Sequence, residues 1–177
     1  YKAMHETGLP DTNQLHGKEL SYNNYIDLDA AWNIAKMFDI PAVSVIKHTN
    51  PCGAAFGDNI QEAYKKAFAS DPVSAFGSIV GLNKNVNKEA AEEISKTFVE
   101  AVIAPSFDDE ALKILTQKPS IRLIEAKDFF EKDSIYKYRN IRGGFLVQTT
   151  NTTILNKEHL RCVTTKKPTD KEINDLV

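Results

Sequence analysis

The sequence is poor in cysteine and has no long apolar run, and each absence excludes a class of protein. Cys52 and Cys162 are the two cysteines, too few and too far apart for a disulfide framework or a CxxC metal knuckle. No apolar stretch approaches the roughly 18 residues of a membrane span, and no basic start followed by a short apolar run indicates a signal peptide. We therefore expect a cytoplasmic protein with reduced thiols.

An excess of charge of one sign is also missing. The chain has 22 basic and 24 acidic residues, for a formal net charge of −2. This balance gives no global field for nucleic acid or an anionic membrane, so we expect neither as a partner, and local groups must hold any anionic ligand. The patterns GxxxxGK[ST] and GxGxxG are absent as well, which leaves P-loop or Rossmann nucleotide binding without support.

What the sequence does contain is an alternation of helical and strand patterns. Its 177 residues, 42% of them apolar, are enough for one core. Segments with helical apolar spacing begin near Asp27, Asp58, Asn87 and Asp108. Short apolar runs that indicate buried strands follow them, at 42–46, 78–82, 98–104 and 121–125. This alternation predicts a mainly parallel sheet with helices packed on its faces.

The pattern changes in the last third of the chain. Further strands are expected at 135–141, 145–149 and 161–165, and a truncated helix is expected from Thr169. We therefore divide the chain into a lead-in loop (1–26), an α/β core (27–127) and a strand-rich extension (128–177). The abrupt ends lead us to expect a fragment of a longer polypeptide.

Lys47 and His48 follow the first strong strand directly. Ligands of open α/β sheets bind beyond the carboxyl ends of the strands. A nearby ammonium disfavours imidazolium, so His48 could accept a proton near pH 7 while Lys47 stabilises an oxyanion. The pair could equally be structural, with the lysine stem on apolar surface and the imidazole hydrogen-bonded in a turn.

The next residues resemble a zinc site in outline. Zinc deaminases place a catalytic glutamate two residues after a histidine, and two cysteine ligands in a PCxxC motif. Asn50 occupies the glutamate position and Ala55 replaces the second cysteine, so metal chemistry lacks its groups. Cys52 is better explained as a small buried apolar residue than as a nucleophile.

Two more polar segments are candidates. Asp71 belongs to the segment 70–78, which leads directly into a predicted strand, and it either orients an amine or amide donor or ends a helix in an Asp-Pro turn. The segment 14–24, which includes Asn23, offers amides and hydroxyls that are either ligand donors or part of a lead-in loop.

Taken together, these segments resemble the AICAR transformylase family of purine biosynthesis. The matching stretches span essentially all 177 residues, namely QLHGKELSYNN, KHTNPCGAAFG, SDPVSAFGSIVGLN, FVEAVIAPSFDDEAL and GGFLVQ. The family transfers a formyl group from 10-formyltetrahydrofolate to the 5-amino group of 5-aminoimidazole-4-carboxamide ribotide (AICAR). Its bifunctional members also act as IMP cyclohydrolases. The resemblance implies a three-layer α/β/α, cytidine-deaminase-like fold with a mainly parallel or mixed sheet, the first of two such units.

The resemblance also implies roles for particular residues. Lys47 and His48 would be catalytic, with His48 shuttling the proton of the attacking amine and Lys47 assisting through its charge. Asp71 and Asn23 would contact AICAR, and no metal would be needed. A homodimer is implied for the full-length protein. Family segments like RYG, KSNAI and SDAFFPF are absent from this sequence, so we expect an incomplete substrate site in the fragment.

Two alternatives stay open at this point. The first is a zinc-dependent, deaminase-like enzyme, and the second is a folding or dimerisation unit without catalysis of its own.

Overall fold

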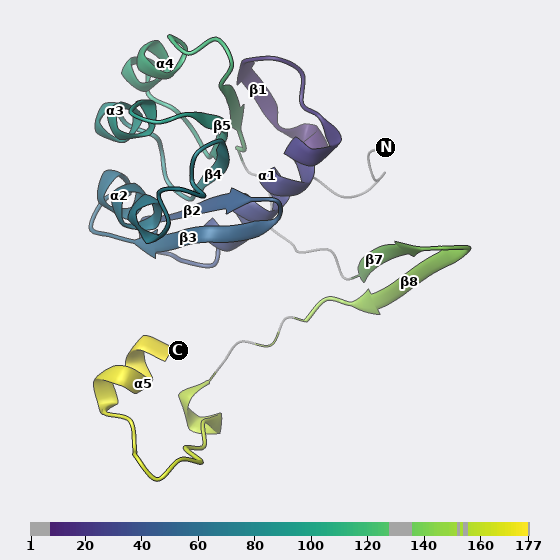
Figure 1. Cartoon of the computed structure of the whole chain (residues 1–177), viewed down its shortest axis with the longest axis vertical. Coiled ribbons are helices and arrows are strands. Elements are labelled where there is room, and N and C mark those ends of the chain that lie inside the picture. Colours follow the sequence, from purple (N-terminus) through teal and green to yellow (C-terminus); the bar gives the residue numbers. More distant parts are fainter. Residues whose placement is uncertain (1–7, 128–135, 152, 154–155, 177) are drawn as a thin grey trace. The chain divides into compact units, whose positions relative to one another are not determined.

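The structure, a computed structural model, describes residues 8–127, 136–151, 153 and 156–176 (Figure 1). The chain divides into two compact units, Tyr1–Glu131 (unit 1) and Lys132–Val177 (unit 2). Over the described ranges, no helix has both the length and the apolar character required to cross a membrane.

Unit 1 is built around a six-stranded mixed sheet in the order β1-β6-β5-β4-β2-β3. The strands are β1 (Asn13–His16), β2 (Ala42–Lys47), β3 (Asn50–Phe56), β4 (Ser78–Leu82), β5 (Val99–Ala104) and β6 (Arg122–Glu125). The neighbours β4, β5 and β6 are parallel, whereas β1 runs antiparallel to β6, and β2 runs antiparallel to β3 and β4. The sheet is mixed because the β2–β3 hairpin reverses the chain and because β1 joins β6 antiparallel, and the alternation of helices and strands revealed neither.

Helices cover both faces of this sheet. They are α1 (Tyr22–Ala35), α2 (Ile60–Ser70), α3 (Lys88–Ser95) and α4 (Asp109–Leu115). In Figure 1, α2, α3 and α4 lie on one side of the sheet and α1 lies on the other. An apolar cluster fills each interface, with Leu28, Trp32 and Ile79 under α1 and with Val80, Ile94 and Leu115 under the other helices. The three-layer α/β/α architecture predicted for the chain is therefore confirmed.

The expected lead-in loop over 1–26 is wrong in its second half. Asn13–His16 forms β1, which pairs with β6, and α1 begins at Tyr22 rather than near Asp27. The hydroxyl of Ser21 accepts the backbone N–H of Asn24, whose side chain in turn accepts the backbone N–H of Ser21. This reciprocal cap starts the helix early, and an asparagine in place of the usual Glu or Gln hid the signal.

The residues Asn50, Pro51 and Gly53 belong to strand β3, although asparagine, proline and glycine are typical of turns. The turn between β2 and β3 is confined to His48 and Thr49. Pro51 is tolerated because β3 is an edge strand, where a missing N–H leaves no ladder bond broken inside the sheet.

Unit 2 contains a hairpin and one α-helix among its described residues. The strands β7 (Tyr136–Ile141) and β8 (Gly144–Thr149) pair antiparallel, and α5 spans Asp170–Leu176 after a 3-10 turn, η2 (Lys157–His159). The start of the predicted strand 135–141 lies outside the described residues. The strand predicted at 161–165 is wrong, since a loop occupies these residues and polar groups bond locally there, as from the Thr164 hydroxyl to the Lys166 carbonyl.

Candidate functional site

The candidate site lies at the edge of the unit 1 sheet where β2 ends. Ile46 pairs with Ile79 in the antiparallel β2–β4 ladder, so the end of β2 lies beside the start of β4. It therefore neighbours the amino ends of the parallel strands β4, β5 and β6. The rule that places ligands at the carboxyl ends of strands holds at this edge only for strands that run antiparallel to these three, such as β2. The antiparallel hairpin is the physical reason for this difference from the expectation.

His48 and Thr49 form a strained two-residue turn at this edge. Both have positive φ angles, 54° at His48 and 63° at Thr49. Two positive φ angles are typical of the type I′ turn, which favours Asn and Gly. The left-handed region costs an ordinary residue about 1–2 kcal/mol, and it is a true outlier for a β-branched residue such as Thr49. Surrounding contacts must therefore impose this conformation.

Hydrogen bonds from three side chains hold the turn. The backbone N–H of Thr49 donates to Oδ1 of Asp27, on α1, over 2.6 Å. The carbonyl oxygen of His48 accepts the Thr49 hydroxyl at 2.7 Å and the Asn50 side-chain amide at 2.8 Å. The turn backbone is thus fixed, while the His48 side chain is exposed to solvent.

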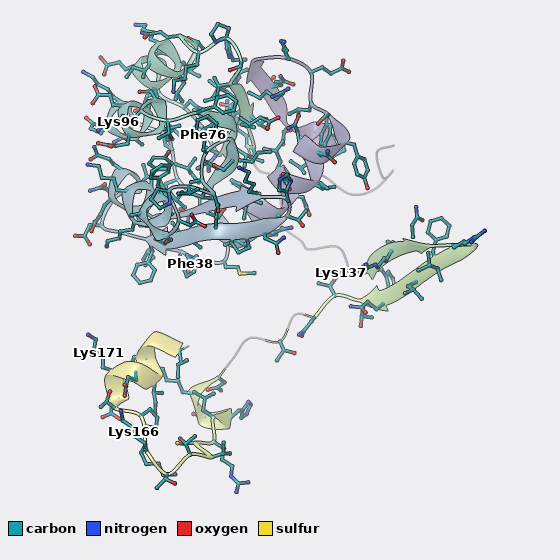
Figure 2. The ribbon with its side chains drawn as sticks, in the orientation of Figure 1. Phe38, Phe76, Lys96, Lys137, Lys166 and Lys171 are labelled. Atoms are coloured by element: carbon teal, nitrogen blue, oxygen red, sulfur yellow. The ribbon has the colours of Figure 1, made fainter. Side chains whose placement is uncertain are left out.

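Lys47 is partly buried and contacts the loop before β4. Its Nζ donates a hydrogen bond of 2.7 Å to the carbonyl oxygen of Phe76. Phe76, labelled in Figure 2, packs its ring against Phe98 with the ring centroids 5.4 Å apart. Alternation along β2 places Lys47 on the same face of the sheet as Val43 and Val45, which is the face covered by α2, α3 and α4. The ammonium therefore lies beside His48 in sequence but is anchored on the 71–77 loop.

Asp71 lies close enough to Lys47 for their charges to interact. It follows the last residue of α2, and its Oδ1 accepts the backbone N–H of Ser74 at 3.0 Å. Hydrogen bonds from the Ser74 hydroxyl and backbone N–H lower the pKa of Asp71, and the charge of Lys47 adds to the effect. The helix-ending role considered for Asp71 is therefore present, and a charged carboxylate lies near the Lys47 ammonium.

Cys52 lies on β3 near the same two charges. The β2–β3 register shifts between Val45 and Ile46, so Cys52 is an extra residue on its strand. Its Sγ contacts the Val45 carbonyl at 3.3 Å, and burial raises the pKa of the thiol. A raised pKa keeps the thiol protonated at neutral pH, which supports the apolar packing role over a nucleophile.

Asn23 is exposed on the first turn of α1. It precedes Asp27 by four residues, so both side chains lie on the same side of the helix, and Asp27 contacts the His48–Thr49 turn. The structure therefore places Asn23 about one helical turn from that loop. Two other polar side chains of the 14–24 segment, those of Gln14 and His16, have structural roles. Nε2 of Gln14 donates to three carbonyls of its own loop, and the His16 ring bonds the carbonyl of Ile121.

Sequence reasoning missed a polar network beside α1. The buried amide of Asn24 donates to Glu100 at 2.9 Å, and Arg122 lies 3.4 Å from the same carboxylate oxygen. Glu100 and Arg122 come from the adjoining strands β5 and β6, near the ends that form the site edge. A charged residue inside the apolar run VEAVIA was the available signal.

An open hollow adjoins the turn on the α1 side. Its volume is about 750 Å³, and it is lined by Leu9, Pro10, Tyr22, Tyr25, Ile26, Asp29, Ala30 and Thr49. Apolar atoms and two tyrosine rings dominate this lining. An aromatic or apolar group could therefore lie next to the turn without losing hydrogen bonds.

The donor set argues against zinc at the turn. Asn50 uses its amide to support the His48 carbonyl, and Ala55 offers no ligand atom. Within the described ranges, no cluster of three or more His, Cys, Asp or Glu side chains is arranged to hold a metal ion.

Comparison with known families identifies the chain's relatives. Residues 1–177 match the AICARFT/IMPCHase bienzyme family, and the chain belongs to this family. The bifunctional purine biosynthesis protein PurH of Acetivibrio thermocellus is 52% identical over 166 residues, which cover 93% of this chain and 32% of that protein. PurH of Caldicellulosiruptor saccharolyticus is 46% identical over 174 residues, covering 98% of this chain and 34% of that protein. The chain thus spans about a third of the length of these curated relatives.

Solved structures give weaker likenesses. The apo dCMP deaminase of cyanophage S-TIM5 has a TM-score of 0.41 and 13% identity, covering 54% of this chain and 90% of that one. RibD of Acinetobacter baumannii has a TM-score of 0.41 and 14% identity, covering 55% of this chain and 35% of that one. At these values the likenesses carry no inference about activity.

Proposed function

We propose that the chain is the N-terminal part of an AICAR transformylase domain in a bifunctional enzyme of purine biosynthesis that is also an IMP cyclohydrolase. The transformylase reaction transfers the formyl group of 10-formyltetrahydrofolate to the 5-amino group of AICAR. One observation carries the proposal: in a chain of this family, Lys47 and His48 lie at an accessible edge of the sheet, and the turn that carries His48 is strained and clamped. Strain of this kind clusters at functional sites.

His48 is assigned the proton transfer. The arylamine of AICAR is a weak nucleophile because its lone pair is conjugated with the ring, so proton removal and positioning must supply much of the rate. The exposed imidazole can accept the proton as the amine attacks the formyl carbon, and it can return the proton to N10 of the folate as the bond from that nitrogen to the formyl carbon breaks and tetrahydrofolate leaves. The ammonium of Lys47 stabilises the oxyanion that develops on the formyl oxygen, after exchanging its bond to the Phe76 carbonyl for the substrate.

Asp71 and Asn23 are assigned contacts with AICAR. The lowered pKa of Asp71 keeps its carboxylate charged and able to accept hydrogen bonds from an amine or amide. Asn23 is exposed on the side of α1 that faces the turn, and its amide can donate and accept.

The wider assignments follow from the family. We place the enzyme in the cytoplasm as a homodimer that binds AICAR and the formyl-folate co-substrate and needs no metal for the transfer. Asn50 and Ala55 supply neither the general acid nor the second thiolate that zinc deamination requires.

The proposal is tested with His48→Ala and Lys47→Ala in the longer bifunctional polypeptide. His48→Ala should lower kcat for formyl transfer by about 10²- to 10⁴-fold, the usual worth of a general acid or base. Lys47→Ala should reduce kcat more than it raises the KM for AICAR. The exposed His159 of unit 2 provides the matched control, His159→Ala, which should leave both constants unchanged.

Unaltered formyl transfer by His48→Ala would refute the proton shuttle. A Lys47→Ala effect confined to KM would reassign Lys47 to binding. Stoichiometric zinc in the purified protein would support the deaminase-like alternative. Calorimetry would measure AICAR binding to this chain and to the longer polypeptide. Binding by the longer polypeptide alone would support the alternative that this chain is a folding or dimerisation unit.

A further inference from the structure

We propose that Asp27 is a positioning residue that holds the His48–Thr49 turn in its left-handed conformation and thereby aims the His48 imidazole. The inference rests on the role proposed for His48 and extends it to a residue on a different element. Asp27 lies on α1, 22 residues before Thr49, and is partly buried. It acts through the backbone of the turn and is not assigned a contact with the reacting groups.

The turn needs an external constraint. His48 and Thr49 both have positive φ angles, and neither has the freedom of glycine that such a turn usually requires. Without a constraint, a β-branched residue at this position would favour an extended conformation. A relaxed turn would carry the His48 side chain in another direction, because the imidazole follows its own backbone.

Asp27 supplies this constraint in a specific way. In the observed left-handed turn the Thr49 N–H donates to the Asp27 carboxylate, and the bond of 2.6 Å is short, as expected when the acceptor is charged. On the other side of the turn, the Asn50 amide and the Thr49 hydroxyl bond the His48 carbonyl. These last two bonds come from within the hairpin. Asp27 is the group that ties the hairpin tip to a helix.

The position of Asp27 on its helix gives the clamp a rigid base. The following residue, Leu28, is fully buried in the apolar cluster beneath α1. One turn earlier, Asn24 is buried and bonded to Ser21 and Glu100. Asp27 is therefore carried by a well-packed segment, so its carboxylate provides a fixed point for a loop that otherwise faces solvent.

The test compares Asp27→Ala and Asp27→Asn in two backgrounds. In the parent sequence of the longer polypeptide, Asp27→Ala should lower kcat for formyl transfer by about tenfold to a hundredfold with the KM for AICAR within about twofold, the range expected for one charge-assisted hydrogen bond. Asp27→Asn keeps an acceptor oxygen, so its kcat for formyl transfer should fall less than that of Asp27→Ala. In the Thr49→Gly background, where the left-handed conformation at position 49 is free of strain, Asp27→Ala should lower kcat by less than about threefold.

A second readout follows the turn without relying on catalysis. In NMR spectra of the 177-residue chain, Asp27→Ala should shift the Thr49 amide proton upfield and move the His48 imidazole signals. The matched control is Asp109→Asn, which removes an exposed carboxylate from the start of α4 and should leave both sets of signals in place.

Unmoved Thr49 and His48 signals in Asp27→Ala would overturn the proposal, as would the same loss of kcat with and without the Thr49→Gly substitution. If His48→Ala proves fully active, the proton shuttle proposed for His48 fails, and the NMR comparison still decides whether Asp27 holds the turn.

Discussion

At the scale of single residues, Asp71 links the stability of unit 1 to pH. Its pKa lies below the ordinary carboxyl value because the Ser74 hydroxyl and N–H donate to it, with help from Lys47. The folded state therefore favours the charged carboxylate. This contribution to stability is complete above the ordinary carboxyl pKa of about 4, and it is lost as the pH falls through the lowered pKa of the folded state.

Asp71→Asn should therefore melt at a lower temperature than the parent chain at pH 7, and the gap between them should close as the pH is lowered below about 4. Thermal unfolding of both proteins over a pH series measures this. The control is Asp109→Asn, which removes an exposed carboxylate at the start of α4 and shows the effect of losing a carboxylate in general. A gap of constant size at all pH values would show that Asp71 acts by packing or by its turn geometry instead of by its charge.

Neighbouring residues also show how far the sequence alone could specify the site. The end of a strand at Lys47 was predictable from the apolar run before it. The left-handed turn was not, because it depends on Asp27, which only the packing of α1 brings into range. Likewise, Asn23 and Asn24 are identical in type, and only the geometry of the cap at Ser21 decides that Asn24 is buried and Asn23 exposed.

At the scale of elements, the approach of β3 to α2 depends on a glycine. A Cβ built at Gly53 would lie 1.8 Å from the carbonyl oxygen of Ala67, which is backbone and cannot move aside like a side chain. Gly53→Ala should lower the free energy of unfolding by about 2–3 kcal/mol, the upper range for overpacked sites. Urea denaturation measures the change. Gly144→Ala is the control, since nothing lies within 4 Å of its added Cβ.

An unchanged unfolding midpoint for Gly53→Ala would mean that β3 can move away from α2 at little cost. In that case the β2–β3 hairpin would be loosely attached, and the turn at its tip would depend still more on its tie to α1.

The strands differ in how well they could be predicted from the sequence. The strand β4 was predicted with its observed bounds, because both of its faces are buried and all its residues are apolar or small. The edge strands β1 and β3 were missed, since their exposed, polar or proline-containing sequences lack an apolar pattern. The predicted strand at 161–165 failed for the opposite reason: β-branched residues suggest a strand, but a strand also needs a pairing partner.

At the scale of the whole molecule, stability should be unevenly distributed. Unit 1 has two apolar clusters, whereas the β7–β8 hairpin exposes the side chains of Tyr138, Phe145 and Val147. A two-stranded hairpin without a covering layer is marginal in water. In hydrogen exchange, the amides of β4 and β5 should therefore exchange at least about a thousandfold more slowly than those of β7 and β8.

Equal protection of the two sets of amides would contradict this expectation and would mean that something covers the hairpin in solution. Hydrogen exchange would then be repeated at several protein concentrations. Protection that falls on dilution would indicate that a second copy of the chain covers the hairpin, whereas constant protection would indicate a contact within one chain.

The order of the strands could not be predicted from the sequence. Alternation correctly indicated a layered α/β protein, but it carries no information on which strands become neighbours. The hairpin at His48–Thr49 determines the strand order at this side of the sheet. It reverses the chain, so β3 lies outside β2 and α2 connects β3 to β4 across β2. The same reversal determined which edge of the sheet carries Lys47 and His48.

The mixed sheet has one more consequence. The helix α1 begins at the edge that carries the turn, whereas α2, α3 and α4 end close to it, as the connections into β4, β5 and β6 require. Peptide dipoles are therefore positive toward this edge on one face of the sheet and negative on the other.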